Sequence, residues 1–125
     1  MSTNALIVFR QNNKKRTCNC ILVNFDGYIQ DGVGETLYNY WTDNEENKKL
    51  CAKNNDIRSF GINFGDIEFY YNSDNTKKFK CMKNIMFNTM KKIDACYTYI
   101  WDEMNPGWNL LKNEELIPIG DILNY

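Results

Sequence analysis

The sequence contains no histidine, only two prolines and no pair of cysteines separated by two residues. Without histidine, serine–histidine–aspartate and cysteine–histidine catalysis are excluded in their usual forms, as are histidine-ligated zinc sites. The side chain that titrates most readily near neutral pH is also missing. Any acid–base chemistry would therefore have to use carboxylates, tyrosine, lysine or cysteine.

The five cysteines are scattered and show no metal-binding spacing. The one close pair, Cys18 and Cys20, lies in a predicted strand, where both side chains point to the same face. An odd number of cysteines, with no signal peptide at the amino terminus, predicts reduced thiols in a cytoplasmic protein. No apolar run reaches membrane-spanning length, so no membrane partner is expected. The sequence indicates no metal site and no cofactor.

Neither sign of charge dominates the chain, which has 15 basic and 16 acidic residues and a formal net charge of −1. This balance argues against direct nucleic-acid binding, which usually shows a basic surface. It also argues against DNA mimicry, because a mimic needs a dense acidic face. Lysine-rich clusters at residues 14–16 and 77–80 lie in predicted turns and are interpreted as solvated loops.

Hydrophobic residues make up 43% and aromatic residues 14% of the 125 positions, enough to build one folded domain. Residues 5–9 and 17–25 predict a hairpin that is covered on both faces, because both of its faces are apolar. Apolar residues at three- and four-residue spacing predict a helix over residues 77–92.

The other predicted elements complete an α+β domain. Residues 35–41 and 45–54 predict two short helices or one kinked helix, and residues 121–125 predict a last helical turn. Residues 57–64 are a loop or an irregular edge. The remaining elements are strands at 67–71, 96–101 and 108–111, turns at 72–76 and 105–107, and an edge strand or loop at 116–119. We therefore expect a mixed or antiparallel sheet built from N- and C-terminal hairpins, with two to three helices packed on one face. An exposed edge at residues 108–111 would permit a homo-oligomer.

A glycine-rich stretch, from Asn24 to Trp41, joins the first hairpin to the first predicted helix. A glycine-rich loop before a helix leaves backbone N–H groups that can bind an anion. A tight turn that binds nothing explains the same residues equally well. The ligand-binding candidates are Asp26, Gly27, Tyr28, Gly32, Gly34 and Glu35.

The opening Met-Ser-Thr-Asn-Ala-Leu-Ile, together with Phe25-Asp26-Gly27-Tyr28 and Gly32-Val33-Gly34, resembles a family of small phage and prophage proteins. Its members typically open Met-Ser-Thr-Arg-Ala-Leu-Ile and carry Asp-Gly-Tyr-Pro-x-Gly-x-Gly ahead of a helix. The resemblance covers residues 1–40, with Asn4 in place of the usual arginine and Ile29 in place of the usual proline. It implies a phage origin, and by analogy an accessory role against host defence.

The sequence leads to three hypotheses for function. The first is a non-enzymatic phage protein that binds and inhibits a host protein, such as a CRISPR nuclease or a signalling protein. Aromatic residues are enriched at interfaces, and the same residues equally fit a core or a sheet face. The interface candidates are Tyr97, Tyr99, Trp101 and Trp108.

The second hypothesis is a small-ligand binder that sequesters a nucleotide-derived signal. Backbone N–H groups at Gly32 and Gly34 would hold a phosphate, and Tyr28 or Trp41 would stack on a base. The third is an enzyme that uses Asp26, Asp31 and Glu35 as acid, base or Mg²⁺ ligands. Each of these carboxylates is also a typical turn or helix-start residue, and no catalytic motif is present.

Overall fold

The computed structural model describes residues 3–14, 17–53, 55–71, 82–83, 95–113 and 115–123. The described strands are β1 Ala5–Arg10, β2 Thr17–Val23, β3 Ile57–Ser59, β4 Glu68–Phe69, β5 Met82–Lys83, β6 Tyr97–Asp102, β7 Asn105–Lys112 and β8 Glu115–Pro118. They form one mixed sheet in the order β4-β3-β2-β1-β6-β7-β8, and β5 pairs with β2. The predicted α+β class is confirmed.

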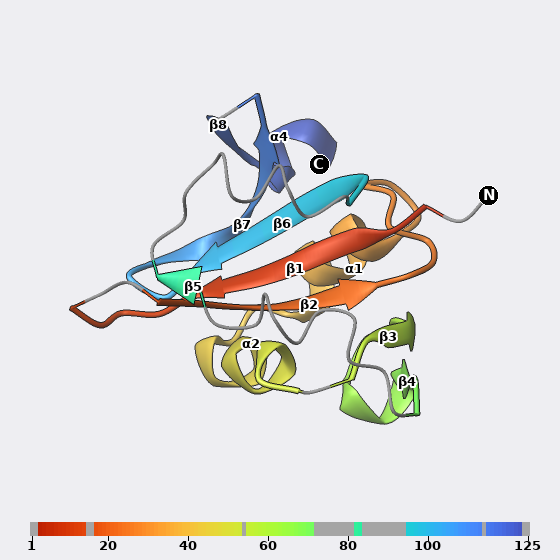
Figure 1. The fold of residues 1–125 in the computed structure, drawn as a ribbon. Coiled ribbons are helices and arrows are strands. Elements are labelled where there is room, and N and C mark those ends of the chain that lie inside the picture. Colours follow the sequence, from red (N-terminus) through yellow and green to blue (C-terminus); the bar gives the residue numbers. More distant parts are fainter. Residues whose placement is uncertain are drawn as a thin grey trace.

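The N-terminal hairpin lies at the centre of the sheet. Strand β1 pairs antiparallel with β2 and parallel with β6, so Ile7 lies opposite Ile21 on one side and Tyr99 on the other. The chain leaves β2, passes through two helices and returns as β3, which pairs parallel with β2 at Val23. This crossover carries the glycine-rich stretch, and Figure 1 shows its first helix behind the central strands.

The described helices all pack on one face of the sheet. They are α1 Val33–Tyr40, α2 Asn44–Cys51 and α4 Ile119–Leu123, with a 3₁₀ turn, η1, at Phe64–Asp66. Leu37, Leu50 and Ile119, one from each helix, are fully buried in one cluster with the strand residues Ile7 and Phe9. Each such side chain contributes about 1.5–3 kcal/mol through burial.

The opposite face of the hairpin is buried as well. Leu6 and Val8 of β1 lie in a second cluster with Cys18, Cys20 and Ile100. Successive side chains in a strand point to opposite faces, so the two clusters divide β1 and β2 by alternation. The prediction that the hairpin is covered on both faces is confirmed.

The C-terminal meander differs from the prediction in two ways. The tight turn falls at residues 103–104, and Asn105–Gly107 already belong to β7. A shift in register between Trp101 and Asp102 accommodates this earlier start. Strand β7 lies between β6 and β8, so residues 108–111 are not an edge that would support self-association. The edge strand on this side of the sheet is β8, where Pro118 lies as predicted.

The predicted helix at residues 77–92 is wrong at Met82 and Lys83, which form β5. They pair antiparallel with Thr17 and Cys18, at the end of β2 that β3 does not reach. Backbone pairing along this strand outweighs the helical spacing at these two positions. The rest of that predicted helix, the lysine cluster at residues 77–80 and the turn at 72–76 lie outside the described residues.

Candidate functional site

The loop that leads from β2 into α1 folds tightly on its own backbone. Asp26 and Asp31 both adopt the left-handed conformation, with φ of 59° and 58°. A Cβ atom on Gly32 would lie 2.5 Å from the carbonyl oxygen of Asp26, and one on Gly34 would lie 2.8 Å from the Cα of Ile29. The glycines are therefore required by close approach of backbone to backbone.

The amides of the first turn of α1 are already used. Val33 N–H donates to the Asp26 carbonyl at 2.8 Å, and Glu35 N–H donates to the Ile29 carbonyl at 2.7 Å. Gly34 N–H donates to the Tyr28 carbonyl at 3.0 Å. The loop carbonyls occupy the positions that a phosphate would need, so the predicted anion site has no free N–H groups at these residues.

A buried tyrosine fixes the loop to the sheet. The Tyr99 hydroxyl donates to the Gly27 carbonyl at 2.6 Å, and the Tyr99 side chain is fully buried. Burial raises the pKa of Tyr99 above its ordinary value, and the neighbouring Tyr97 raises it further. The neutral hydroxyl therefore persists as the donor over the physiological range.

The loop carboxylates do not assemble a metal site. Among the described residues no group of three or more histidine, cysteine, aspartate or glutamate side chains is placed to hold a metal ion. Glu35 Oε1 instead accepts a hydrogen bond from the backbone N–H of Asp31 at 3.2 Å. Asp26 and Asp31 provide the two left-handed turn positions. The proposed Mg²⁺ ligand set of Asp26, Asp31 and Glu35 is therefore not brought together.

Three of the four predicted interface residues belong to the core. Tyr99 is fully buried, and Trp101 and Trp108 are each 4% exposed, which corrects the interface prediction for all three. Their polar atoms have internal partners: Trp101 Nε1 donates to Asn44 Oδ1 at 2.6 Å. Residues 97, 99 and 101 alternate along β6, and this face of the strand packs against the helices. Tyr97 is partly buried and stacks on Tyr99.

An open pocket of about 290 Å³ lies at the other end of α1. It is formed where α1 passes into α2 and where the chain runs from β3 towards η1. Tyr40 and Ile62 are 58% and 47% exposed and form its apolar rim. The lining residues are Tyr40, Trp41, Thr42, Asp43, Glu46, Ile62 and Asn63.

The wall formed by Trp41 is rigid. Trp41 is 2% exposed, and its Nε1 donates to the Gly61 carbonyl at 2.9 Å. Its own carbonyl accepts from Trp108 Nε1 at 2.7 Å and from Asn47 Nδ2 at 3.1 Å. These bonds join the start of α2, β7 and the loop before η1, so the pocket wall is held from three directions.

Further aromatic rings support Trp41 from the side of η1. The Phe60 ring stacks on Trp41 at 5.4 Å between centroids, and the Phe64 ring meets it edge-on at 5.1 Å. The ammonium groups of Lys49 and Lys53 lie 5.4 and 5.6 Å from the Phe64 ring centroid. This arrangement is the attractive geometry of a cation over an aromatic face.

Two carboxylates complete the rim. Asp43 is the N-cap of α2, and its Oδ2 accepts from the Glu46 N–H at 3.0 Å. The ion pair found within the described part of the chain, Arg10 with Asp102, involves neither Asp43 nor Glu46. The pocket therefore combines an apolar wall with two carboxylates, at the N-terminus of α2, for which no ion pair is found within the described residues.

No pattern in the sequence predicts this pocket. Its residues come from two segments about twenty positions apart, Tyr40–Glu46 and Ile62–Asn63, which carry no common motif. Tyr40 and Trp41 end the helix predicted at residues 35–41, and Asp43 follows it closely. Nothing in the sequence indicates that the loop before η1 would lie against them.

Comparison with known proteins gives no further assignment. No family model matches the chain, and neither the curated proteins nor the solved structures contain a match. The resemblance of residues 1–40 to phage proteins stays a prediction. In the part of the chain that the structure describes, no helix is long and apolar enough to cross a membrane.

Proposed function

We propose that this chain is a small phage accessory protein that acts by binding a host protein, most simply as an inhibitor of an anti-phage defence protein. The observation that supports the binding role is the open pocket beside Tyr40 and Ile62. Exposed aromatic and aliphatic side chains that border a pocket are typical of the central anchors of protein interfaces. The phage context and the defence target derive from the resemblance of residues 1–40.

The rigidity of the pocket favours binding. Trp41 is held by bonds to Gly61, Trp108 and Asn47, so its position does not have to be ordered when a partner docks. A preorganised surface avoids the loss of conformational entropy that weakens association. The volume of about 290 Å³ lies at the lower end of the range for small-ligand sites, about 300–1,000 Å³, and is large enough for one inserted side chain.

A nucleotide-derived ligand is less well supported. It would need free amides at the start of α1, and those of Val33, Gly34 and Glu35 donate to loop carbonyls. Of the two proposed stacking residues, Trp41 is 2% exposed and therefore unavailable, whereas Tyr28 is 47% exposed. A thermal-shift screen against nucleotides and cyclic nucleotides tests this alternative, and a reproducible increase in Tm with one of them would restore it.

The test of the proposed function is affinity capture from cells of the bacterial host, with quantification by mass spectrometry. The double variant Tyr40→Ala, Ile62→Ala removes the exposed apolar rim, and we expect it to reduce capture of the partner by about tenfold or more, as the loss of central anchors does. Because both side chains are exposed, its free energy of unfolding should change by less than about 1 kcal/mol.

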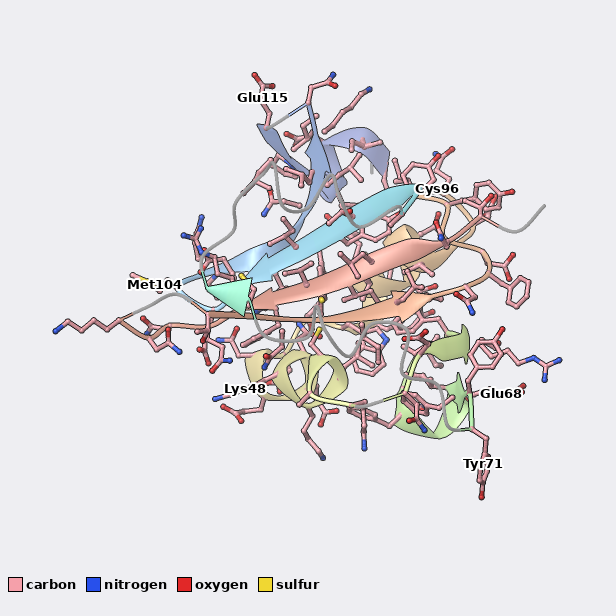
Figure 2. All side chains as sticks on the ribbon, viewed as in Figure 1. Lys48, Glu68, Tyr71, Cys96, Met104 and Glu115 are labelled. Atoms are coloured by element: carbon pink, nitrogen blue, oxygen red, sulfur yellow. The ribbon has the colours of Figure 1, made fainter. Side chains whose placement is uncertain are left out.

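A matched control replaces an aromatic and an aliphatic side chain elsewhere. Tyr71 is 94% exposed and projects away from the domain in Figure 2, and Leu116 is 41% exposed on β8. The variant Tyr71→Ala, Leu116→Ala should capture the partner as the unmodified chain does. Equal capture by the pocket variant, or no protein captured specifically by the unmodified chain, would refute the proposal. Inhibition is then measured as phage plating efficiency on cells that carry the captured protein's defence system.

A further inference from the structure

The charge of the pocket rim allows a more specific statement about the partner. We propose that the pocket receives an arginine side chain from the surface of the bound protein, with its guanidinium at the carboxylates of Asp43 and Glu46. This inference rests on the proposed function, because it specifies which chemistry fills the same pocket. It requires an apolar channel for the arginine stem and a negative end for its head.

The apolar part is provided by Tyr40 and Ile62. Both line the pocket and both remain about half exposed, so a partner side chain can cover them. The methylene groups of arginine bury well along such a surface while the charged head stays polar. A planar guanidinium also stacks favourably on a tyrosine ring, which a compact ammonium group does less well.

The negative part is provided by Asp43 and Glu46. One oxygen of Asp43 is occupied as the cap of α2, and the structure gives the Glu46 carboxylate no hydrogen-bond or cation partner within the described residues. Two carboxylates at one rim repel an anionic ligand and attract a cation. Arginine presents five N–H donors in a fixed fork that matches carboxylate oxygens.

The neighbouring lysines do not supply this cation. Lys49 and Lys53 place their ammonium groups over the Phe64 ring, and neither residue lines the pocket. Lys48, the remaining lysine of α2, is solvent-exposed and does not line it either. The Phe64 ring therefore already holds two ammonium groups, while no lysine or arginine among the described residues lies over the Tyr40 ring.

The test is a titration of the ¹⁵N-labelled protein followed by NMR. The probes are a blocked Gly-Arg-Gly peptide and the same peptide with citrulline, which keeps the shape of arginine and removes its charge. We expect the arginine peptide to shift the amide resonances of residues 40–46 and 61–63 and the Trp41 indole N–H, with a Kd on the order of millimolar. Citrulline should bind about tenfold more weakly, because charge-assisted bonds are lost.

The double variant Asp43→Asn, Glu46→Gln sharpens the test. Asparagine caps a helix as well as aspartate does, so α2 is retained while both charges disappear. We expect this variant to lose the preference for arginine over citrulline, with an otherwise unchanged amide spectrum. Equal shifts from the two peptides, shifts that lie elsewhere, or no shift at tens of millimolar peptide would each overturn the inference.

The failure of this inference can be separated from the failure of the proposed function. If the double variant Tyr40→Ala, Ile62→Ala loses the cellular partner and the double variant Asp43→Asn, Glu46→Gln retains it, the pocket binds a protein but does not recognise arginine. If no partner is captured at all, the proposed function fails while the peptide titration still reports on the pocket. Competition of a captured partner by free arginine peptide, and not by the citrulline peptide, would connect the two.

Discussion

The segments before and after α1 contain similar residue types, namely aspartate, aromatic side chains and, on each side, a glycine that approaches another backbone. Before the helix, the loop carbonyls accept the N–H groups of Val33, Gly34 and Glu35. After it, the chain bonds Trp41 firmly and leaves an open pocket beside Tyr40 and Asp43. A loop rich in glycine can thus use its own backbone N–H groups internally, whereas an open pocket can form from residues that share no motif.

Trp41 belongs both to the hydrophobic core and to the pocket wall. We expect Trp41→Ala to lower the free energy of unfolding by about 3–5 kcal/mol, the usual range for a buried large aromatic residue. Urea unfolding followed by circular dichroism measures this. Trp41→Phe is the control, since it keeps a ring against Phe60 and Phe64 while it removes the bond to Gly61 and one ring of the indole, and we expect it to cost less than the alanine variant. A loss below about 1.5 kcal/mol for the alanine variant would show that the wall is not part of the cooperative core.

The glycines of the two segments give the next test. A Cβ on Gly32 would lie 2.5 Å from the Asp26 carbonyl oxygen and 2.6 Å from that of Tyr28, so Gly32→Ala forces the loop apart. We expect a loss of about 1–3 kcal/mol in the free energy of unfolding, as for overpacked sites. Gly65 in η1 is the control, because a Cβ there approaches only the Asn63 side chain, at 3.2 Å. Equal losses from Gly32→Ala and Gly65→Ala would remove the steric explanation for Gly32.

The hydrogen bond from Tyr99 to Gly27 holds the loop before α1, and its contribution to stability should depend on pH. Tyr99→Phe leaves the buried Gly27 carbonyl without its donor, which we expect to cost about 1–3 kcal/mol. Because the folded-state pKa of Tyr99 is raised, its contribution is complete below the pKa of an unfolded tyrosine, about 10, and falls as the pH rises above it. The difference in free energy of unfolding between the two proteins should therefore shrink from pH 8 towards pH 11. A constant difference over this range would mean that Tyr99 titrates normally.

Much of the fold follows from local patterns in the sequence. The alternation in residues 5–9 and 17–25 predicted the central hairpin and its two buried faces, and β1 and β2 show both. Tyr97, Tyr99 and Trp101 alternate along a predicted strand and therefore share one face. Their burial on that face could have been predicted from the sequence. The assignment of Met82 and Lys83 to a helix was wrong because the spacing of apolar residues carries no information about backbone pairing with β2.

The pocket was beyond sequence reasoning for a physical reason. Its position depends on the Trp41 indole reaching the Gly61 carbonyl, a bond between residues twenty positions apart. Any backbone carbonyl can accept such a bond, so no residue type marks the acceptor. The glycine-rich loop presents the opposite problem, because its sequence shows that N–H groups exist and does not show that the Asp26 and Ile29 carbonyls accept them.

The smallest expected effect on stability separates folding from binding at Asp43. Asp43→Asn keeps the bond to the Glu46 N–H and should change the free energy of unfolding by only a few tenths of a kcal/mol, whereas Asp43→Ala should cost about 1 kcal/mol. Thermal unfolding at low ionic strength measures both. If asparagine costs as much as alanine, the carboxylate charge stabilises the start of α2 and is committed to folding. If asparagine leaves stability unchanged yet weakens binding of the arginine peptide, the fold does not need the charge at Asp43 and that charge acts in binding. The loop before α1 differs, because the N–H groups of Val33, Gly34 and Glu35 are used within the fold.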